Sequence, residues 1–166
     1  MNLRPYQQEA LESVLTDFHR HDSLLAVMPT GTGKTVLLAH IVSKASKGKC
    51  LVIAHREELI NQLATTFRQN GIDVGVEMAD RHANNDWWTP PKVVIGTIQT
   101  LMANDGARLK QLVDDPNDWS LTVIDECHHA PAESYGRLID HMQQNLEHRL
   151  LGVTATPDRA DELAMG

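Results

Sequence analysis

Short apolar runs alternate along the chain with stretches whose hydrophobic residues have helical spacing. The runs lack the polar alternation of a strand with one solvated face, which is typical of strands buried on both faces of a sheet. The pattern predicts strands at 24–28, 50–54, 74–78, 93–96, 121–124 and 150–154.

The segments between these strands carry the signals of helices. In 57–69, Leu59, Ile60, Leu63 and Phe67 fall on one face at i, i+3 and i+4 spacing. Further helices are expected at 4–19, 35–46 and 134–146, the first with a proline in its opening turn, where proline is tolerated. Turn-forming residues and two prolines make 79–91 an expected loop.

Strands separated by helices predict an α/β fold, with a mostly parallel sheet covered by helices on both faces. The 166 residues suit a single domain, 1–166, with one core. The apolar runs are far too short to cross a bilayer, and the N-terminus has no signal-peptide core, so we expect a cytoplasmic protein. The two cysteines, Cys50 and Cys127, have no metal-binding spacing; we expect Cys50 in the core.

A glycine-rich segment follows the first expected strand and opens a helix, which is the setting of a phosphate-binding loop. Its residues are Thr30, Gly31, Thr32, Gly33, Lys34 and Thr35. Glycines let the backbone N–H groups point at phosphate oxygens, and the helix N-terminus adds a favourable dipole. Lys34 would reach the β- and γ-phosphates, and the Thr35 hydroxyl would bind Mg²⁺. Because Met28 stands where the full motif has its first glycine, a glycine-rich turn without a ligand remains the alternative.

Two acidic residues follow the strand at 121–124. Carboxylates at the carboxyl end of a parallel strand face the crevice in which ligands bind. Asp125 is placed to hold Mg²⁺, in part through water, and Glu126 to orient and polarise an attacking water. The alternative is a solvated acidic turn, which the phosphate loop earlier in the chain disfavours.

The motifs together resemble superfamily 2 helicases of the DEAD/DEAH type. Asp-Glu-Cys-His at 125–128 resembles motif II, and Thr-Ala-Thr-Pro at 154–157 resembles motif III. Arg-Pro-Tyr-Gln at 4–7 is similar to the Q-motif region, and 54–59 and 96–101 resemble motifs Ia and Ib. They stand in the family's order and span nearly the whole chain. Within the superfamily, the opening residues and the motif II region are similar to the type III restriction-like group, which includes RadD-like DNA-repair helicases.

This resemblance implies an N-terminal RecA-like ATP-binding domain that uses ATP and Mg²⁺. Gln7, with Arg4, would contact adenine, and Lys34, Asp125, Glu126 and His128 would form the catalytic group. The remaining implied roles are coupling through His128 to Thr154 and Thr156, and contact with the nucleic-acid backbone by Arg56 and Thr97. Arg56 could equally be a solvated residue after a strand, and His129 is better explained as a partly buried residue at a helix start. Trp87 and Trp88 could stack on bases, although anchoring the loop is the simpler explanation for one of them.

The resemblance also implies partners that the 166 residues do not contain. A family motor needs a second RecA-like domain, whose arginines stabilise the transferring phosphate, and no second strand–helix series or arginine motif follows here. We therefore expect the isolated chain to be a very poor ATPase. Nucleic acid is the expected substrate, DNA rather than RNA, although a net charge of −7 argues against a large phosphate-binding surface.

The sequence is compatible with four functions. The favoured one is the motor domain of an ATP-dependent DNA helicase or translocase in repair or recombination, with an RNA helicase domain as a variant. The second is the motor of a restriction endonuclease. The third, a small-molecule kinase with a phosphate loop, does not explain motifs II and III together. The fourth is a nucleotide-dependent binding module without turnover.

Overall fold

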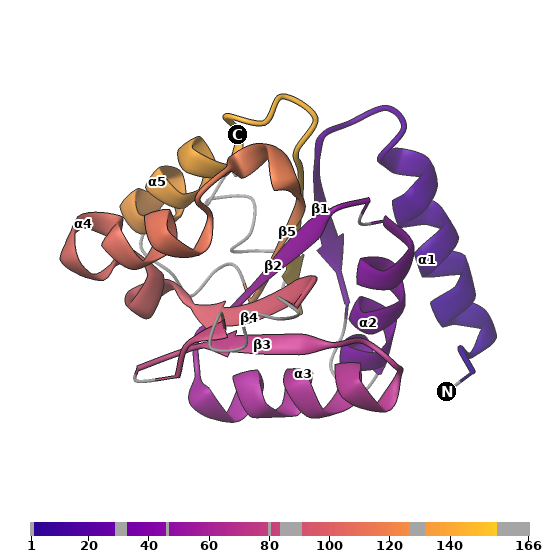
Figure 1. Ribbon diagram of the computed structural model, residues 1–166. Helices are drawn as coiled ribbons and strands as arrows, with labels where there is room; N and C mark the ends of the chain where they lie inside the picture. The colour runs from indigo at the N-terminus through magenta and orange to yellow at the C-terminus, as the bar shows by residue number, and fades with distance from the viewer. Residues whose placement is uncertain are drawn as a thin grey trace.

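Six strands form a single sheet at the centre of the protein, in the order β1-β6-β5-β2-β4-β3 (Figure 1). Every neighbouring pair is parallel. The computed structural model describes residues 2–28, 33–45, 47–79, 81–83, 91–126 and 132–155. The strands are β1 Ser23–Val27, β2 Lys49–Ala54, β3 Val74–Glu77, β4 Val93–Thr97, β5 Trp119–Asp125 and β6 Arg149–Thr154.

Helices cover both faces of this sheet, as the sequence predicts. Figure 1 shows α4 and α5 on one side of the strands and α1, α2 and α3 on the other. The helices are α1 Pro5–Asp17, α2 Lys34–Ala45, α3 Glu57–Gln69, α4 Ile98–Leu112 and α5 Ala132–Met142, with a short 3₁₀ turn at Pro116–Asp118. None of the helices in the described ranges is both long enough and apolar enough to cross a membrane.

Strand β2 shows how the central strands supply two hydrophobic cores. Cys50, Val52 and Ala54 pack with α1, α2 and α3, whereas Leu51 and Ile53 pack with α4 and α5. Successive side chains of a strand point to opposite faces, so an uninterrupted apolar run is what a strand between two helical layers requires. The expectation that Cys50 belongs to the core is confirmed, and burial raises the pKa of its thiol.

Helix α4 is the one long element that the hydrophobic pattern does not predict. Ala103, Asn104, Asp105 and Gly106 have non-helical backbone angles, so two helical segments meet at a kink. The buried residues of α4 lie on either side of it, with Leu101 before and Leu109 after. The polar residues at the kink therefore break the helical spacing that would have revealed the element.

Helix α5 also differs from its expected range, 134–146, because it begins at Ala132 and ends at Met142. The chain then turns, and the Asn145 side-chain amide donates to the Trp119 carbonyl at 3.0 Å. The Asn145 side-chain oxygen, Oδ1, accepts the Glu147 backbone N–H, also at 3.0 Å. Asparagine commonly replaces helical hydrogen bonds with local ones of this kind, which explains the early end.

Because all six strands run in one direction, their carboxyl ends meet at one edge of the sheet. That edge receives Gly33 and Lys34 after β1, Arg56 after β2, Thr97 from β4, Asp125 and Glu126 from β5, and Thr154 from β6. In open α/β sheets, ligands bind at this edge.

Candidate active site

Lys34 brings the phosphate loop and the acidic motif together. Its ammonium Nζ lies 2.9 Å from Asp125 Oδ1 and 2.7 Å from Glu126 Oε1, to which it donates a hydrogen bond. Lys34 is the first residue of α2, Asp125 is the last residue of β5, and Glu126 follows it. One cation thus faces two carboxylates from an element 92 positions away along the chain.

The electrostatics of this cluster favour a charged lysine. Burial by itself lowers the pKa of Lys34, but the hydrogen bond to Glu126 and the negative charge of Asp125 outweigh that effect, and the pKa is raised overall. The Asp125 side chain is only 3% exposed, and the approach of Lys34 to its Oδ1 atom is an ion pair without hydrogen-bond geometry. The cluster carries one excess negative charge, which suits the binding of a further cation.

Glu126 stands in an unusual backbone conformation. Its φ angle is 50°, in the left-handed region that residues other than glycine seldom adopt. Such strained positions concentrate at functional sites, where surrounding structure holds them in place. The turn directs the Glu126 carboxylate to Lys34, with 18% of the side chain exposed, so the same carboxylate can also be reached by solvent.

Gln7 contacts the phosphate loop from helix α1. Its side-chain Nε2 donates to the Gly33 carbonyl at 3.2 Å, and its Oε1 accepts the Arg4 backbone N–H at 2.9 Å. The residue is 4% exposed. Gly33 has φ of 72°, which favours glycine, and a Cβ atom added there would lie 2.3 Å from Gln7 Nε2 and would push this amide aside. Arg4 is exposed at the N-terminal end of α1, where Gln7 fixes its backbone.

The other predicted residues occupy the same edge. Thr35 follows Lys34 in the first turn of α2. Thr154 is fully buried, and its carbonyl accepts the Met28 backbone N–H at 2.8 Å, which joins motif III to the start of the phosphate loop. Of the predicted set, Thr30, Gly31, Thr32, His128 and Thr156 lie outside the described residues, as do Cys127, His129, Trp87 and Trp88.

The two predicted nucleic-acid contacts both precede helices. Arg56 is exposed directly before α3. Thr97 directly precedes α4 and is 7% exposed, and its hydroxyl accepts the Thr100 backbone N–H at 3.2 Å. Thr97 therefore caps its helix, and the more accessible polar side chains at this end of α4 are those of Gln99 and Thr100. A direct contact from Thr97 to nucleic acid stays a prediction.

The sequence patterns do not predict a polar network that lies beside α4. Glu77 is 3% exposed in β3, where its Oε2 lies 2.7 Å from Arg108 Nε and its Oε1 accepts the Ala83 backbone N–H at 2.8 Å. Arg108 also donates to the carbonyls of Ala79 and Arg81. The available signal was a glutamate at a buried position of an otherwise apolar strand, since buried carboxylates require a partner.

Comparison with known proteins places this site in a family. The family model described as "Type III restriction enzyme, res subunit" matches residues 1–159, from α1 through the whole sheet. The chain belongs to this family. The resemblance to superfamily 2 helicases and the RecA-like α/β fold, both predicted from the motifs, are thereby confirmed.

Individual relatives and a related solved structure agree with this placement. The chain is 28% identical to the putative ATP-dependent helicase IRC3 of Saccharomyces cerevisiae, over 98% of this chain and 24% of that protein. It is 33% identical to the putative DNA 3'-5' helicase Rad25 of Halobacterium salinarum, over 98% of this chain and 24% of that protein. The fold matches the UvsW helicase of bacteriophage T4 with a TM-score of 0.71 at 19% identity, over 98% of this chain and 56% of that one. The chain thus spans about a quarter of the length of these two curated relatives.

Proposed function

We propose that this res-subunit family domain binds MgATP and serves as the ATP-hydrolysing motor domain of a DNA helicase or translocase that acts in repair or recombination. The observation that carries the proposal is the meeting of Lys34 with Asp125 and Glu126. A nucleotide triphosphate needs a cation for its phosphates, a carboxylate for its metal ion and a base or orienting group for water. All three groups lie within one cluster at the ligand-binding edge of the sheet.

The residues fit a Mg²⁺ ion that arrives with its nucleotide. Mg²⁺ is usually held by one or two carboxylates together with substrate phosphates and water, and rarely by a cage of protein ligands. Among the described residues, no group of three or more His, Cys, Asp or Glu side chains could hold a metal ion. The buried Asp125 carboxylate and the Thr35 hydroxyl, at the start of α2, would hold this ion, which neutralises phosphate charge when bound.

The protein's own groups then divide the work. Lys34 would pair with the β- and γ-phosphates after leaving the carboxylates, and the N-terminus of α2 would add backbone N–H donors. Glu126 would orient the attacking water and accept its proton. Gln7 would read the adenine from beside Gly33, and Thr154 and Thr156 would pass the state of the nucleotide to the rest of the motor.

DNA is the proposed track because curated relatives of this chain, Rad25 among them, are named as DNA helicases. The description of the matching family favours a second candidate, the motor of a restriction endonuclease. The two motors would share this site, and they differ in whether DNA is cut. Incubating the complete parent protein with ATP and closed circular DNA separates them, since the helicase or translocase leaves the circle intact.

Hydrolysis of ATP with and without single-stranded DNA tests the main proposal. We expect the 166-residue chain to bind nucleotide but to show almost no DNA-stimulated hydrolysis, because an arginine from a second domain typically contributes about 10³–10⁵ in rate. The parent protein should hydrolyse ATP in response to DNA, and Glu126→Gln in that protein should abolish turnover and retain ATP binding. Robust DNA-stimulated hydrolysis by the isolated chain would refute the motor-half proposal.

A further inference from the structure

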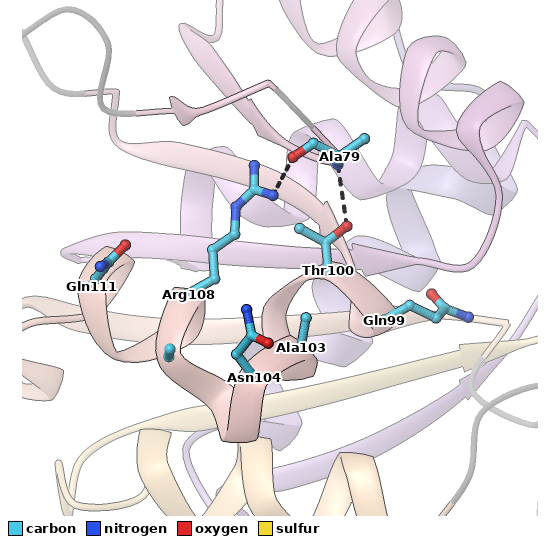
Figure 2. Close-up of a pocket in the computed structure, with 8 residues that line it drawn as sticks. Ala79, Gln99, Thr100, Ala103, Asn104, Arg108 and Gln111 are labelled. Carbon is cyan, nitrogen blue, oxygen red and sulfur yellow. Dashed lines mark hydrogen bonds between the residues drawn. The ribbon is translucent and has the colours of Figure 1, made fainter.

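A cavity of about 470 Å³ lies at the same edge of the sheet beside helix α4. Figure 2 shows the side chains of α4 along one side of it and Ala79, from the end of the β3 region, facing them. The cavity is lined by Ala79, Gln99, Thr100, Ala103, Asn104, Ala107, Arg108 and Gln111. We propose that this pocket, named here the α4 pocket, takes an unpaired nucleobase of the nucleic-acid strand. The inference rests on the proposed function. It adds a contact with a base, whereas the contacts expected of Arg56 and Thr97 are with the nucleic-acid backbone.

The wall of the α4 pocket is held in place by hydrogen bonds that need no ligand. Arg108 donates to the Ala79 carbonyl, and the Ala79 backbone N–H donates to Thr100 Oγ1 at 3.3 Å (Figure 2). Beneath them, the buried Glu77 carboxylate lies 2.7 Å from Arg108 Nε. The pocket therefore exists before anything binds, and a ligand does not have to order its walls.

The kink in α4 shapes the mouth of the pocket. Asn104, Asp105 and Gly106 have φ angles of 53°, 61° and 78°, three consecutive residues in the left-handed region. Asparagine, aspartate and glycine are the residues that tolerate this region best. In a continuous helix, residue 104 would have a different position. The kink places Asn104 between Gln99 and Gln111 on the lining (Figure 2).

The lining groups match a base better than they match a phosphate. Gln99, Asn104 and Gln111 each offer amide donors and an amide acceptor, as base edges do, whereas a phosphate only accepts. Arg108 is the only charged residue among the described lining residues, and it is already paired with Glu77, so these residues offer no surplus positive charge to a phosphate. Among the described residues that line the pocket, none is acidic, although the chain as a whole has a net charge of −7.

The size and place of the pocket agree with this ligand. Its volume lies within the range of about 300–1,000 Å³ that small-molecule sites occupy. It opens on the helix that Thr97 caps, at the carboxyl edge that also carries Arg56. A strand whose backbone passes the N-termini of α3 and α4 would reach it, and single strands are bound by proteins that accept their splayed bases.

The test compares two strands with equal phosphates and different bases. Fluorescence anisotropy at low salt would measure the protein's affinity for oligodeoxyadenylate of about 12 nucleotides and for an abasic strand of the same length. We expect wild type to bind the adenine strand about tenfold more tightly, as one well-formed amide–base pair would give. The double variant Gln99→Ala/Gln111→Ala should bind the adenine strand no more tightly than the abasic strand, and its affinity for the abasic strand should equal that of wild type.

The variants and their control are chosen to keep the fold. Gln99 and Gln111 are exposed, and alanine is the strongest helix former, so the double variant should unfold at the wild-type temperature. Gln69→Ala, an exposed glutamine at the far end of α3, should keep the tenfold ratio. Equal binding of both strands by wild type, or an unchanged ratio in the double variant, would overturn the α4 pocket while leaving the proposed function standing. Failure of the parent protein to bind either strand would overturn both.

Discussion

Replacing Lys34 with alanine should alter two properties of the protein in different ways. The ammonium is the counter-charge of Asp125, whose side chain is 3% exposed, and removing one partner of a buried ion pair typically costs about 3–5 kcal/mol. Because the Lys34 and Glu126 side chains keep 21% and 18% exposure, water screens part of the charge. We therefore expect the free energy of unfolding, without nucleotide, to fall by about 3 kcal/mol.

The same substitution removes the proposed phosphate contact. A hydrogen bond to a charged group contributes about 1.5–3 kcal/mol, which corresponds to a loss of about 10- to 150-fold in affinity for MgATP. Isothermal titration calorimetry would measure the affinity, and urea denaturation would measure stability. Lys44→Ala is the matched control, because it removes the same charge from an exposed position on the same helix.

The two measurements separate the parts of the reasoning. If Lys34→Ala bound MgATP as tightly as wild type and Lys44→Ala, the phosphate-loop assignment would be wrong. If its stability without nucleotide equalled that of wild type, the ion pairs with Asp125 and Glu126 would contribute nothing. Calorimetry must be run without urea, at a temperature at which the variant is folded. A loss of affinity then cannot be attributed to unfolding.

Three further predictions follow from particular contacts. Wild type should prefer ATP over GTP by about tenfold, because guanine reverses donor and acceptor at the edge that Gln7 would read, and Gln7→Ala should bring the two affinities together in calorimetry. Arg108→Ala should destabilise the chain by about 3–5 kcal/mol, because it removes the guanidinium that pairs with the buried Glu77 carboxylate. Adding Glu77→Gln should recover part of that loss in urea denaturation, and additive effects of the two substitutions would contradict the pair. Burial lowers the pKa of His148, so below about pH 6.5 the unfolded chain takes up a proton more readily than the native one, and stability should fall with pH down to the lowered pKa. His148→Gln should reduce that slope between pH 7.5 and 5.5.

The assignment of His148 as a neutral side chain rests on its hydrogen bonds. Its Nδ1 lies 2.8 Å from the Trp119 carbonyl oxygen, which can only accept, so this nitrogen carries the proton. Its Nε2 lies 2.8 Å from Thr122 Oγ1 and accepts from that hydroxyl. Protonation of Nε2 would place a positive charge in a site that is 4% exposed and would require the Thr122 hydroxyl to change from donor to acceptor. The burial of that charge is the physical origin of the expected acid sensitivity.

The layered fold could be predicted because its signal is local. Each buried strand is an apolar run, and both helical layers follow from residues such as Leu51 and Val52, which pack on opposite faces. The kinked helix could not be predicted in this way. Asn104 to Gly106 interrupt its spacing, and what compensates is an arrangement of Arg108 with Glu77 and Ala79, residues about 30 positions away.

The residue types of the candidate site could be predicted from the sequence, but the contacts between them could not. A glycine, a lysine and a threonine before a helix indicate phosphate binding wherever they occur after a strand, and two carboxylates after a buried strand indicate a metal. The strand order decides which of these groups meet. Lys34 reaches Glu126 because β6 lies between β1 and β5, an arrangement that no local pattern contains.

The contacts of Lys34 also bear on how the affinity for nucleotide should be interpreted. Without nucleotide, its ammonium lies 2.7 Å from Glu126 and 2.9 Å from Asp125, which are the two groups that the proposed reaction would use for water and metal. A triphosphate therefore has to take the lysine away from both carboxylates, and the measured affinity is the phosphate interaction minus the cost of separating these pairs. ATP without Mg²⁺ would leave two carboxylates, Asp125 and Glu126, facing a phosphate chain with Lys34 as their shared cation and no metal ion between them, a like-charge arrangement that costs free energy. Binding should accordingly depend strongly on Mg²⁺, and replacing Glu126 by glutamine should preserve or increase the affinity, because a neutral amide holds the ammonium less tightly than a carboxylate does.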